Sequence, residues 1–217
     1  MGQAPGLLDS MKSLLKNLFV PAAAVAILFG LSACETTSLG RKNSFDFDPP
    51  LTQPKNPAKV KLYLSTGAQR LYVVEGDKVL LATPVTVGAP SSPTPLGTYT
   101  IYSKVENRRR VSSPDSGYPM TFWMEFKPAY GLHWGFVKPY PATHGCVRMP
   151  IDSARKVYSV VRVGTPINIA KSQPWDATIG KTLPVLDDGP LPNPPKSYLL
   201  SPEVFQDARK GRMWQWD

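Results

Sequence analysis

The sequence has few of the residues that would place it in several familiar classes of protein. Only two of its 217 residues are cysteines, so at most one disulfide can form and a multi-disulfide scaffold is excluded. Its most apolar uncharged run, 18–33, is shorter than the roughly 20 residues of a membrane-spanning helix. Acidic residues are also scarce, at 16 against 25 basic ones. The length of 217 residues is enough for one domain of ordinary size, and the 24 prolines cluster outside the best strand patterns, so we expect one domain with extended flanks.

The first 33 residues have the features of an export signal. Basic residues within 11–16 precede the apolar run, which ends in Leu31-Ser32-Ala33-Cys34. This order is typical of a signal peptide, and its ending resembles the site at which bacteria attach lipid to a cysteine. We predict that residues 1–33 are a signal peptide whose true start is Met11, and that Cys34 carries the lipid. The alternative is an incidental or buried thiol at Cys34.

The net charge of +9 indicates attraction to an anionic partner. The densest basic run is Lys104 with the three arginines 108–110. An exported chain first meets acidic lipids and wall polymers, so we expect these rather than nucleic acid; a merely solvated face is the alternative. The predicted location is the cell envelope, on the periplasmic side, as a lipid-anchored monomer. Glu35 follows Cys34 where an Asp would favour the inner membrane, which favours outer-membrane anchoring.

The middle of the chain predicts a mainly β domain over residues 59–170. Residues 34–58 are rich in Pro, Asn, Asp, Ser and Thr, and we expect them to form the lipidated tether. Apolar residues then alternate with polar ones from 60 to 64, and a hairpin is expected where 69–75 and 78–87 meet at Gly76-Asp77. A loop with three prolines spans 88–97. Further strands are expected at 98–103, 119–126, 131–135 and 165–170.

One short helix is expected after Cys146. Apolar residues recur at helical spacing from Ala154 to Val161, with Asp152 as the expected cap and Gly164 as the expected end. Residues 171–217 are interpreted as a proline-rich arm without a core, with a short helix between Ser201-Pro202 and Gly211. The arm ends near Trp214 and Trp216, for which packing on the domain is favoured over contact with sugar rings.

Both histidines of the chain, His133 and His144, lie within thirteen positions of Cys146. If Cys34 carries lipid, Cys146 has no intramolecular partner, so an exported protein retains a free thiol. A neighbouring histidine makes such a thiol a useful nucleophile near neutral pH. Gly145 allows close backbone approach, and nearby N–H groups are candidates for an oxyanion hole. Proximity in sequence alone does not decide which histidine is the base.

Two other interpretations of this cluster remain open. Cys146 can be an inert buried residue, with both histidines serving structural roles. A zinc site with His133, His144 and Cys146 as ligands is the second. It is disfavoured because no Asp or Glu lies near enough in sequence to orient the ligands. We therefore expect no metal and no cofactor.

The segment Thr143-His144-Gly145-Cys146-Val147-Arg148 resembles the signature of the L,D-transpeptidase catalytic domain, also called the YkuD-like family. That signature is an upstream His followed by Ser/Thr-His-Gly-Cys, an apolar residue and Asn or Arg. Residues 94–99, Thr-Pro-Leu-Gly-Thr-Tyr, resemble a second family segment. Only nine residues separate His133 from Thr143, which is similar to short-loop members that carry Tyr-Pro-Ala at 140–142. Trp134 stands where a small residue often follows the first His.

The resemblance implies a β-sandwich fold and a peptidoglycan cross-linking activity. It implies that Cys146 attacks the third residue of a stem peptide, releases D-Ala and forms a thioester, with His133 as base. A second stem would then accept the acyl group to give a 3–3 cross-link. His144 would fix local geometry, and Arg148 would bind a stem carboxylate or support the loop. The remaining predicted substrate-binding residues are Thr143, Tyr140 and Trp134.

Three alternatives concern what this site does. Water as acceptor would make the protein an L,D-carboxypeptidase or a hydrolase of existing links, and a protein lysine would make it an enzyme that links envelope proteins to peptidoglycan. A wall-binding lipoprotein without catalysis is the third, but a binding module has no need of a free thiol.

Overall fold

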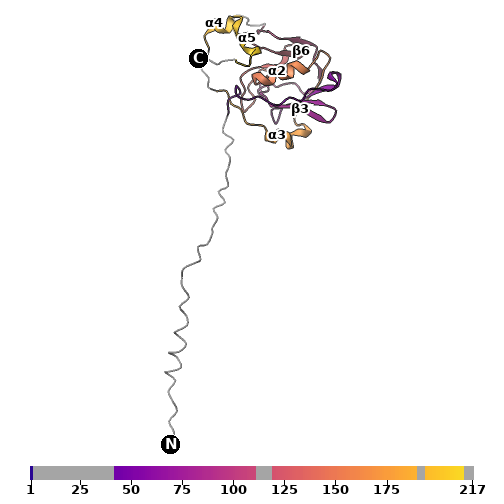
Figure 1. Cartoon of the computed structure of the whole chain (residues 1–217), viewed down its shortest axis with the longest axis vertical. Coiled ribbons are helices and arrows are strands. Elements are labelled where there is room, and N and C mark those ends of the chain that lie inside the picture. Colours follow the sequence, from indigo (N-terminus) through magenta and orange to yellow (C-terminus); the bar gives the residue numbers. More distant parts are fainter. Residues whose placement is uncertain (2–41, 111–118, 190–193, 213–217) are drawn as a thin grey trace. The chain divides into compact units, whose positions relative to one another are not determined.

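The computed structural model describes Met1 and residues 42–110, 119–189 and 194–212 (Figure 1). The chain divides into two units, Met1–Ser38 and Leu39–Asp217, and the described elements belong to the second. The predicted signal peptide and the lipidation site Cys34 lie outside the described residues. In the part of the chain that is described, no helix is both long and apolar enough to cross a membrane.

The first sheet has five strands in the order β3-β2-β1-β9-β4. A 3-10 turn, η1 (Pro57–Lys59), leads into it. Its strands are β1 (Val60–Ser65), β2 (Arg70–Glu75), β3 (Lys78–Pro84), β4 (Gly97–Thr100) and β9 (Pro166–Ala170). The hairpin expected at Gly76-Asp77 is confirmed, because Glu75 pairs with Lys78 and Gly76 adopts φ +60°. The alternation expected from 60 to 64 is confirmed as well, with Val60, Leu62 and Leu64 buried.

The second sheet has four strands in the order β5-β6-β7-β8. They are β5 (Ser103–Val105), β6 (Trp123–Lys127), β7 (Tyr130–Trp134) and β8 (Val147–Met149). The single strand expected at 98–103 is wrong, because the chain changes sheets there: β4 pairs with β9, whereas β5 pairs with β6. Between them Ile101 is buried and exchanges backbone hydrogen bonds with the turn before β9.

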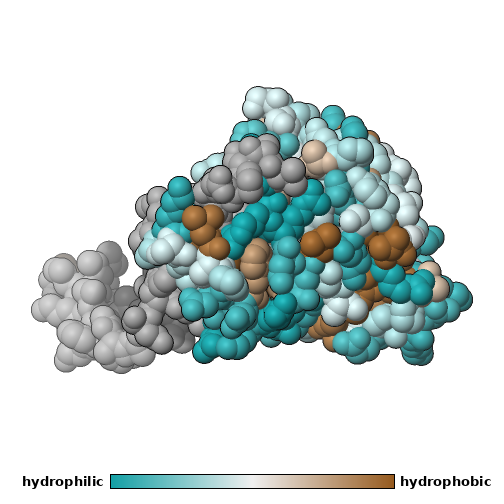
Figure 2. Space-filling model, turned by 90° about the horizontal axis from the view of Figure 1, so that it is seen from above, coloured by the Kyte–Doolittle hydropathy of each residue, from teal (hydrophilic) through white to brown (hydrophobic). Residues whose placement is uncertain are grey.

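The two sheets share one core, which makes the domain a mainly β, sandwich-type fold. β1, β2 and β9 contribute buried aliphatic residues from one side, and β6, β7 and β8 contribute Met124, Phe126, Leu132, Trp134, Val147 and Met149 from the other. On the face drawn in Figure 2, hydrophobic residues form separate patches among hydrophilic ones, as is usual for an exposed surface.

The helix expected after Cys146 is α2 (Ile151–Val160), and it packs on β7. Its buried residues include Ala154 and Val157, as the helical spacing predicts. Asp152 is not the cap: Pro150 occupies that position, and Asp152 lies in the first turn beside Arg155. Gly164 does not end the helix either, because Val161 is already extended and Gly164 lies in the turn before β9.

The flanks pack more closely on the domain than their composition predicts. After β9 come η3 (Pro174–Ala177), α3 (Ile179–Thr182), α4 (Lys196–Leu200) and α5 (Glu203–Arg209). The short helix expected between 201 and 211 is thus present as α5. The expectation of no core there is wrong, since Val204 and Ala208 of α5 are fully buried in the main cluster. Part of the expected tether is also fixed, because Ser44 is buried against Asp188.

Candidate active site

The site lies where β7 and β8 run side by side. These strands are parallel, with Leu132 opposite Val147 and His133 opposite Arg148. Side chains alternate between the two faces of a strand. Leu132 and Val147 point into the core, so His133 and Arg148 share the opposite face, together with Cys146 immediately before β8. The fold thus brings His133 and Cys146 together on one surface of the second sheet.

Cys146 is a partly exposed free thiol. Its Sγ lies 3.7 Å from the carbonyl oxygen of Ala129, to which the thiol donates. Burial raises the pKa of the Cys146 thiol above its ordinary value. The hydrogen bond from the N–H of Gly131 and the positive charges of Arg148 and Arg108 act to lower this pKa, but the effect of burial is larger. At neutral pH Cys146 is therefore a neutral thiol rather than a thiolate.

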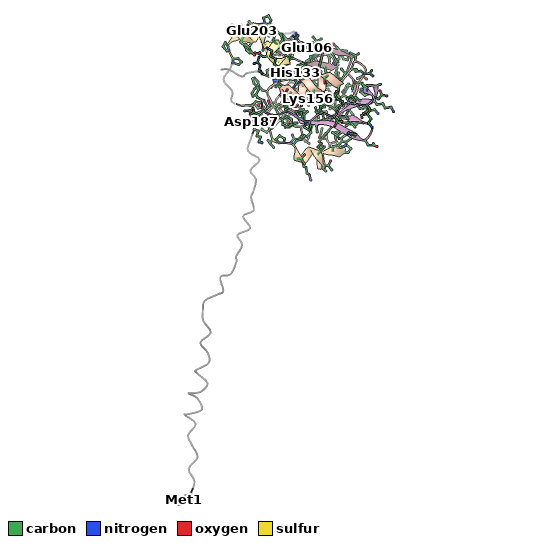
Figure 3. The ribbon with its side chains drawn as sticks, viewed as in Figure 1. Met1, Glu106, His133, Lys156, Asp187 and Glu203 are labelled. Atoms are coloured by element: carbon green, nitrogen blue, oxygen red, sulfur yellow. The ribbon has the colours of Figure 1, made fainter. Side chains whose placement is uncertain are left out.

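His133, which is labelled in Figure 3, is buried, with only 3% of its surface exposed. Its Nδ1 lies 2.5 Å from the backbone oxygen of Trp134. A carbonyl can only accept, so Nδ1 carries the proton and Nε2 is left as the basic nitrogen. The pKa of His133 is lowered to about 3, mainly by burial. The hydrogen bond to Trp134 acts to raise this pKa, whereas the positive charges of Arg148 and Arg108 lower it further. The imidazole is therefore neutral across the physiological range.

The loop before Cys146 is held by hydroxyl groups. The Thr143 hydroxyl donates to the Cys146 carbonyl at 2.6 Å and accepts from the Gly145 N–H at 3.1 Å. Thr94 donates to the Gly145 carbonyl at 3.0 Å and accepts from the Gly88 N–H at 2.9 Å. The proline-rich loop 88–97 therefore lines this turn. Thr143, 3% exposed, is a support of the loop rather than an open binding group.

Gly145 is required at its position for two reasons. Its φ is +105°, a conformation that residues with a Cβ rarely adopt. A Cβ built there would lie 2.3 Å from Cε1 of Tyr130. The Tyr130 ring thus packs directly on the turn that carries Cys146.

The other predicted site residues are placed differently from one another. Trp134 is not a pocket residue: it is 1% exposed and points into the core, because it alternates with His133. His144 and Tyr140 are exposed, and Tyr140 keeps 57% of its surface. Arg148 is half-buried, and its side chain passes along Gly135, where an added Cβ would lie 2.8 Å from Cγ of Arg148.

The segment 135–146 connects the parallel strands β7 and β8, and its length is about the minimum for a connection between parallel strands.

Two charged residues near the site were missed from the sequence. Glu125 of β6 shares the site face, and its charge acts on Cys146 together with that of Arg108. The two form an ion pair of 3.1 Å. No Asp or Glu is near the cluster in sequence, yet the fold brings the Glu125 carboxylate close to it. The missed signal is the alternation of 123–126, which puts Met124 and Phe126 in the core and Trp123 and Glu125 on the site face. Among the described residues, no group of three or more His, Cys, Asp or Glu is arranged to hold a metal ion.

A free thiol and a buried imidazole thus lie on one face of a mainly β scaffold. Residues 59–169 match the family model described as the L,D-transpeptidase catalytic domain, so the chain belongs to that family.

Curated relatives and solved structures with similarity to the chain carry the same family name. The chain is 27% identical over 120 residues to L,D-transpeptidase 1 of Mycobacterium tuberculosis. The aligned region covers 48% of this chain and 48% of that protein. The chain thus spans about half the length of the curated relatives it matches. An L,D-transpeptidase from Stackebrandtia nassauensis has a TM-score of 0.48 at 22% identity, over 57% of this chain and 60% of that one. One from Mycobacterium smegmatis has a TM-score of 0.44 at 25% identity, over 52% and 58%.

The lowered pKa of His133 predicts a pH-dependent stability. The unfolded chain binds a proton at this residue below pH 6.5, whereas the folded chain does so only near pH 3. The contribution of neutral His133 to the free energy of unfolding is therefore fully present above pH 6.5 and is lost as the pH falls below that value. Between pH 6.5 and 5 the free energy of unfolding should drop by roughly 1.5 kcal/mol. Urea unfolding of wild type and His133→Gln measures this, because the variant should lack that part of the slope.

The exposed histidine provides the matched control for that measurement. His144→Gln removes the chain's other histidine, which is exposed rather than buried, so its slope can be compared directly with that of His133→Gln. Equal slopes in wild type and His133→Gln would contradict a buried neutral imidazole.

Proposed function

We propose that the protein is a peptidoglycan L,D-transpeptidase that acts through a thioester on Cys146. The observation that carries this proposal is that a free thiol and a buried neutral histidine share one face of two adjacent parallel strands. Membership of the L,D-transpeptidase catalytic domain family supports it. We also propose that the domain is a short-loop member of that family.

In the first half-reaction the Cys146 sulfur attacks the carbonyl carbon of the third stem residue. The thiol proton passes to Nε2 of His133, which the Trp134 carbonyl leaves available by fixing the proton on Nδ1. The tetrahedral intermediate then collapses, its bond to the terminal D-Ala breaks, and His133 returns the proton to the departing amine. A thioester and free D-Ala result.

In the second half-reaction a side-chain amine of another stem attacks the thioester carbonyl. The amine proton passes through His133 to the thiolate, the carbon–sulfur bond breaks and a 3–3 cross-link forms. Water as acceptor would give carboxypeptidase or hydrolase activity, and a protein lysine would attach an envelope protein. These alternatives use the same residues and differ only in the acceptor.

The surrounding residues have supporting roles in this scheme. The Gly145 N–H already donates to the Thr143 hydroxyl, so other backbone N–H groups of the turn around Cys146 stabilise the oxyanion. Arg148, on the site face, binds a stem carboxylate or supports the loop. Thr143 holds the turn, while exposed His144 and Tyr140 contact substrate or fix local geometry. Neither a metal nor a cofactor takes part.

The protein works at the cell envelope in this proposal. Cys34 carries a lipid after removal of residues 1–33, and residues from 34 onward hold a monomeric domain, approximately 59–170, on the periplasmic side, with the outer membrane favoured. The basic surface then faces acidic lipids and wall polymers rather than nucleic acid.

Incubation of the purified protein with tetrapeptide-bearing muropeptides tests the proposal. Mass spectrometry should detect D-Ala release and a dimer joined through third stem residues. Tripeptide without dimer would assign the hydrolytic alternative, and a modified lysine in an added envelope protein would assign the attachment enzyme. No reaction at the third stem residue would contradict all three.

A further inference from the structure

We propose that Glu125 is a positioning residue that aligns Cys146 and His133 with each other. The inference rests on the proposed function, because it assigns a role within that reaction. Glu125 lies in β6, next to the strand that carries His133, and 12% of its side chain is exposed. Its carboxylate reaches the neighbours of both reacting groups through one hydrogen bond each.

The Glu125 carboxylate accepts hydrogen bonds from four residues. Oε1 accepts from the N–H of Ala129 at 3.1 Å. Oε2 accepts from Nε1 of Trp123 at 3.2 Å and from the Arg108 guanidinium at 3.1 Å. The Tyr102 hydroxyl is a further hydrogen-bond partner. Hydrogen bonds to a charged acceptor are roughly twice as strong as neutral ones, so the group fixes its partners firmly.

The first connection runs to the nucleophile through Ala129. The carbonyl of this residue accepts from Cys146 Sγ at 3.7 Å. Ala129 has φ +65°, a left-handed conformation that costs a residue with a Cβ about 1–2 kcal/mol. The hydrogen bond from its N–H to Glu125 offsets that cost and fixes the turn between β6 and β7. The carbonyl that contacts the thiol is thereby held in place.

The second connection runs to the base through Trp123. The indole ring stacks on His133, with centroids 5.5 Å apart and 29° between the planes. Arg108 lies over the same indole at 4.4 Å and is paired with Glu125. The carboxylate therefore fixes the indole both directly, through Nε1, and through the arginine. A fixed indole sets the orientation of the imidazole.

Glu125 is ionised in this arrangement. Burial would raise its pKa, but the hydrogen bonds from Trp123, Ala129 and Tyr102 and the charge of Arg108 lower it overall. Its negative charge also opposes formation of a thiolate at Cys146. A role through charge alone would thus make the Glu125→Gln variant more reactive, whereas a positioning role makes it less active. The two roles therefore predict opposite changes in the activity of Glu125→Gln.

Glu125→Gln and a matched control, Glu75→Gln, test the inference in the full-length protein. Glu75 also accepts two backbone N–H bonds, from Lys55 at 3.0 Å and from Asn56 at 2.5 Å, but it lies in the other sheet. With tetrapeptide muropeptides, kcat for D-Ala release should fall at least about tenfold in Glu125→Gln, with KM within about twofold. Glu75→Gln should match wild type in both.

Histidine NMR gives a readout that does not depend on activity. The chain has only two histidines, so selective labelling yields two ring signals, one buried and one exposed. Glu125→Gln should shift or broaden the His133 signal and leave that of His144 unchanged. Trp123→Phe keeps a smaller aromatic ring but removes the Nε1 donor to Glu125, so kcat for D-Ala release should also fall. Because replacing the stacked indole alters the His133 signal by itself, kcat is the deciding readout in this variant if Glu125→Gln does not fold.

An unmoved His133 signal together with an unchanged or increased kcat in Glu125→Gln would overturn the inference, as would an equal loss in Glu75→Gln. Failure of the proposed function looks different. In that case Cys146→Ala would retain D-Ala release, whereas the NMR comparison would still report on the contact between Glu125 and His133.

Discussion

Replacement of Cys146 by alanine is expected to lower D-Ala release from tetrapeptide muropeptides by at least about 10³-fold. The reason is that, in the proposed reaction, the sulfur forms the covalent bond to the substrate, and no other described cysteine exists to replace it. Intact-mass measurement of wild type during turnover should show an adduct with the mass of the acyl donor less D-Ala. That adduct should be missing in the variant, while the thermal midpoint stays near the wild-type value because the side chain is small and partly exposed.

Cys34→Ser is the matched control, since it removes the only other cysteine of the chain. It should retain full turnover in detergent solution while losing the predicted lipid. Release of D-Ala by Cys146→Ala at the wild-type rate would refute the proposed enzyme. Loss of activity in Cys34→Ser would instead show that the second thiol takes part in the reaction.

Gly145→Ala is expected to reduce turnover by about 10²-fold, since misplacement of a reacting group by about 1 Å can have an effect of that size. Its φ of +105° and a Cβ position 2.3 Å from the Tyr130 ring require the turn to move, and Cys146 is the next residue. The free energy of unfolding should fall as well, by about 1–3 kcal/mol. Chemical denaturation and D-Ala release measured on the same samples separate the two effects.

Gly164→Ala is the matched control, because it introduces a Cβ at a positive φ without the close contact to a neighbouring ring. Gly164 has φ +95°, similar to Gly145, but no atom lies within 4 Å of the position that a Cβ would occupy there. The variant should lose stability comparably while keeping turnover within about twofold of wild type. If both variants lost turnover equally, the turn at Gly145 would have no special role in placing Cys146.

Several elements could be predicted from local pattern alone. The hairpin at Gly76-Asp77 follows from a turn dipeptide between β-rich runs, and α2 follows from apolar spacing. Cys146 and the two histidines stand out in the sequence because the chain has so few groups of either type, whereas the choice of His133 as the base depends on the family resemblance. The structure then places Cys146 and His133 on one face of the second sheet.

The remainder depends on contacts between distant segments, which a single sequence does not reveal. Trp134 and His133 are neighbours in sequence, so a comparison of motifs assigns both to the same pocket. Because side chains alternate along β7, Trp134 instead points into the core, away from the face that carries His133. Glu125 was missed because it is 21 positions from Cys146, and only the pairing of β6 with β7 brings it close. The change of sheets near Ile101 was likewise invisible, because a continuous β-type pattern runs across it.

The burial of α5 has a practical consequence for recombinant work. The match to the family model ends at residue 169, yet Val204 and Ala208 fill part of the same core as the sheets, and Arg109 donates to the carbonyl of Ser201 at 2.9 Å. A polypeptide cut after Ala170 would present that apolar surface to water, and newly exposed patches of this kind promote self-association. Preparations of the domain should therefore extend through residue 212 to remain soluble at the concentrations that crystallisation and inhibitor screening require.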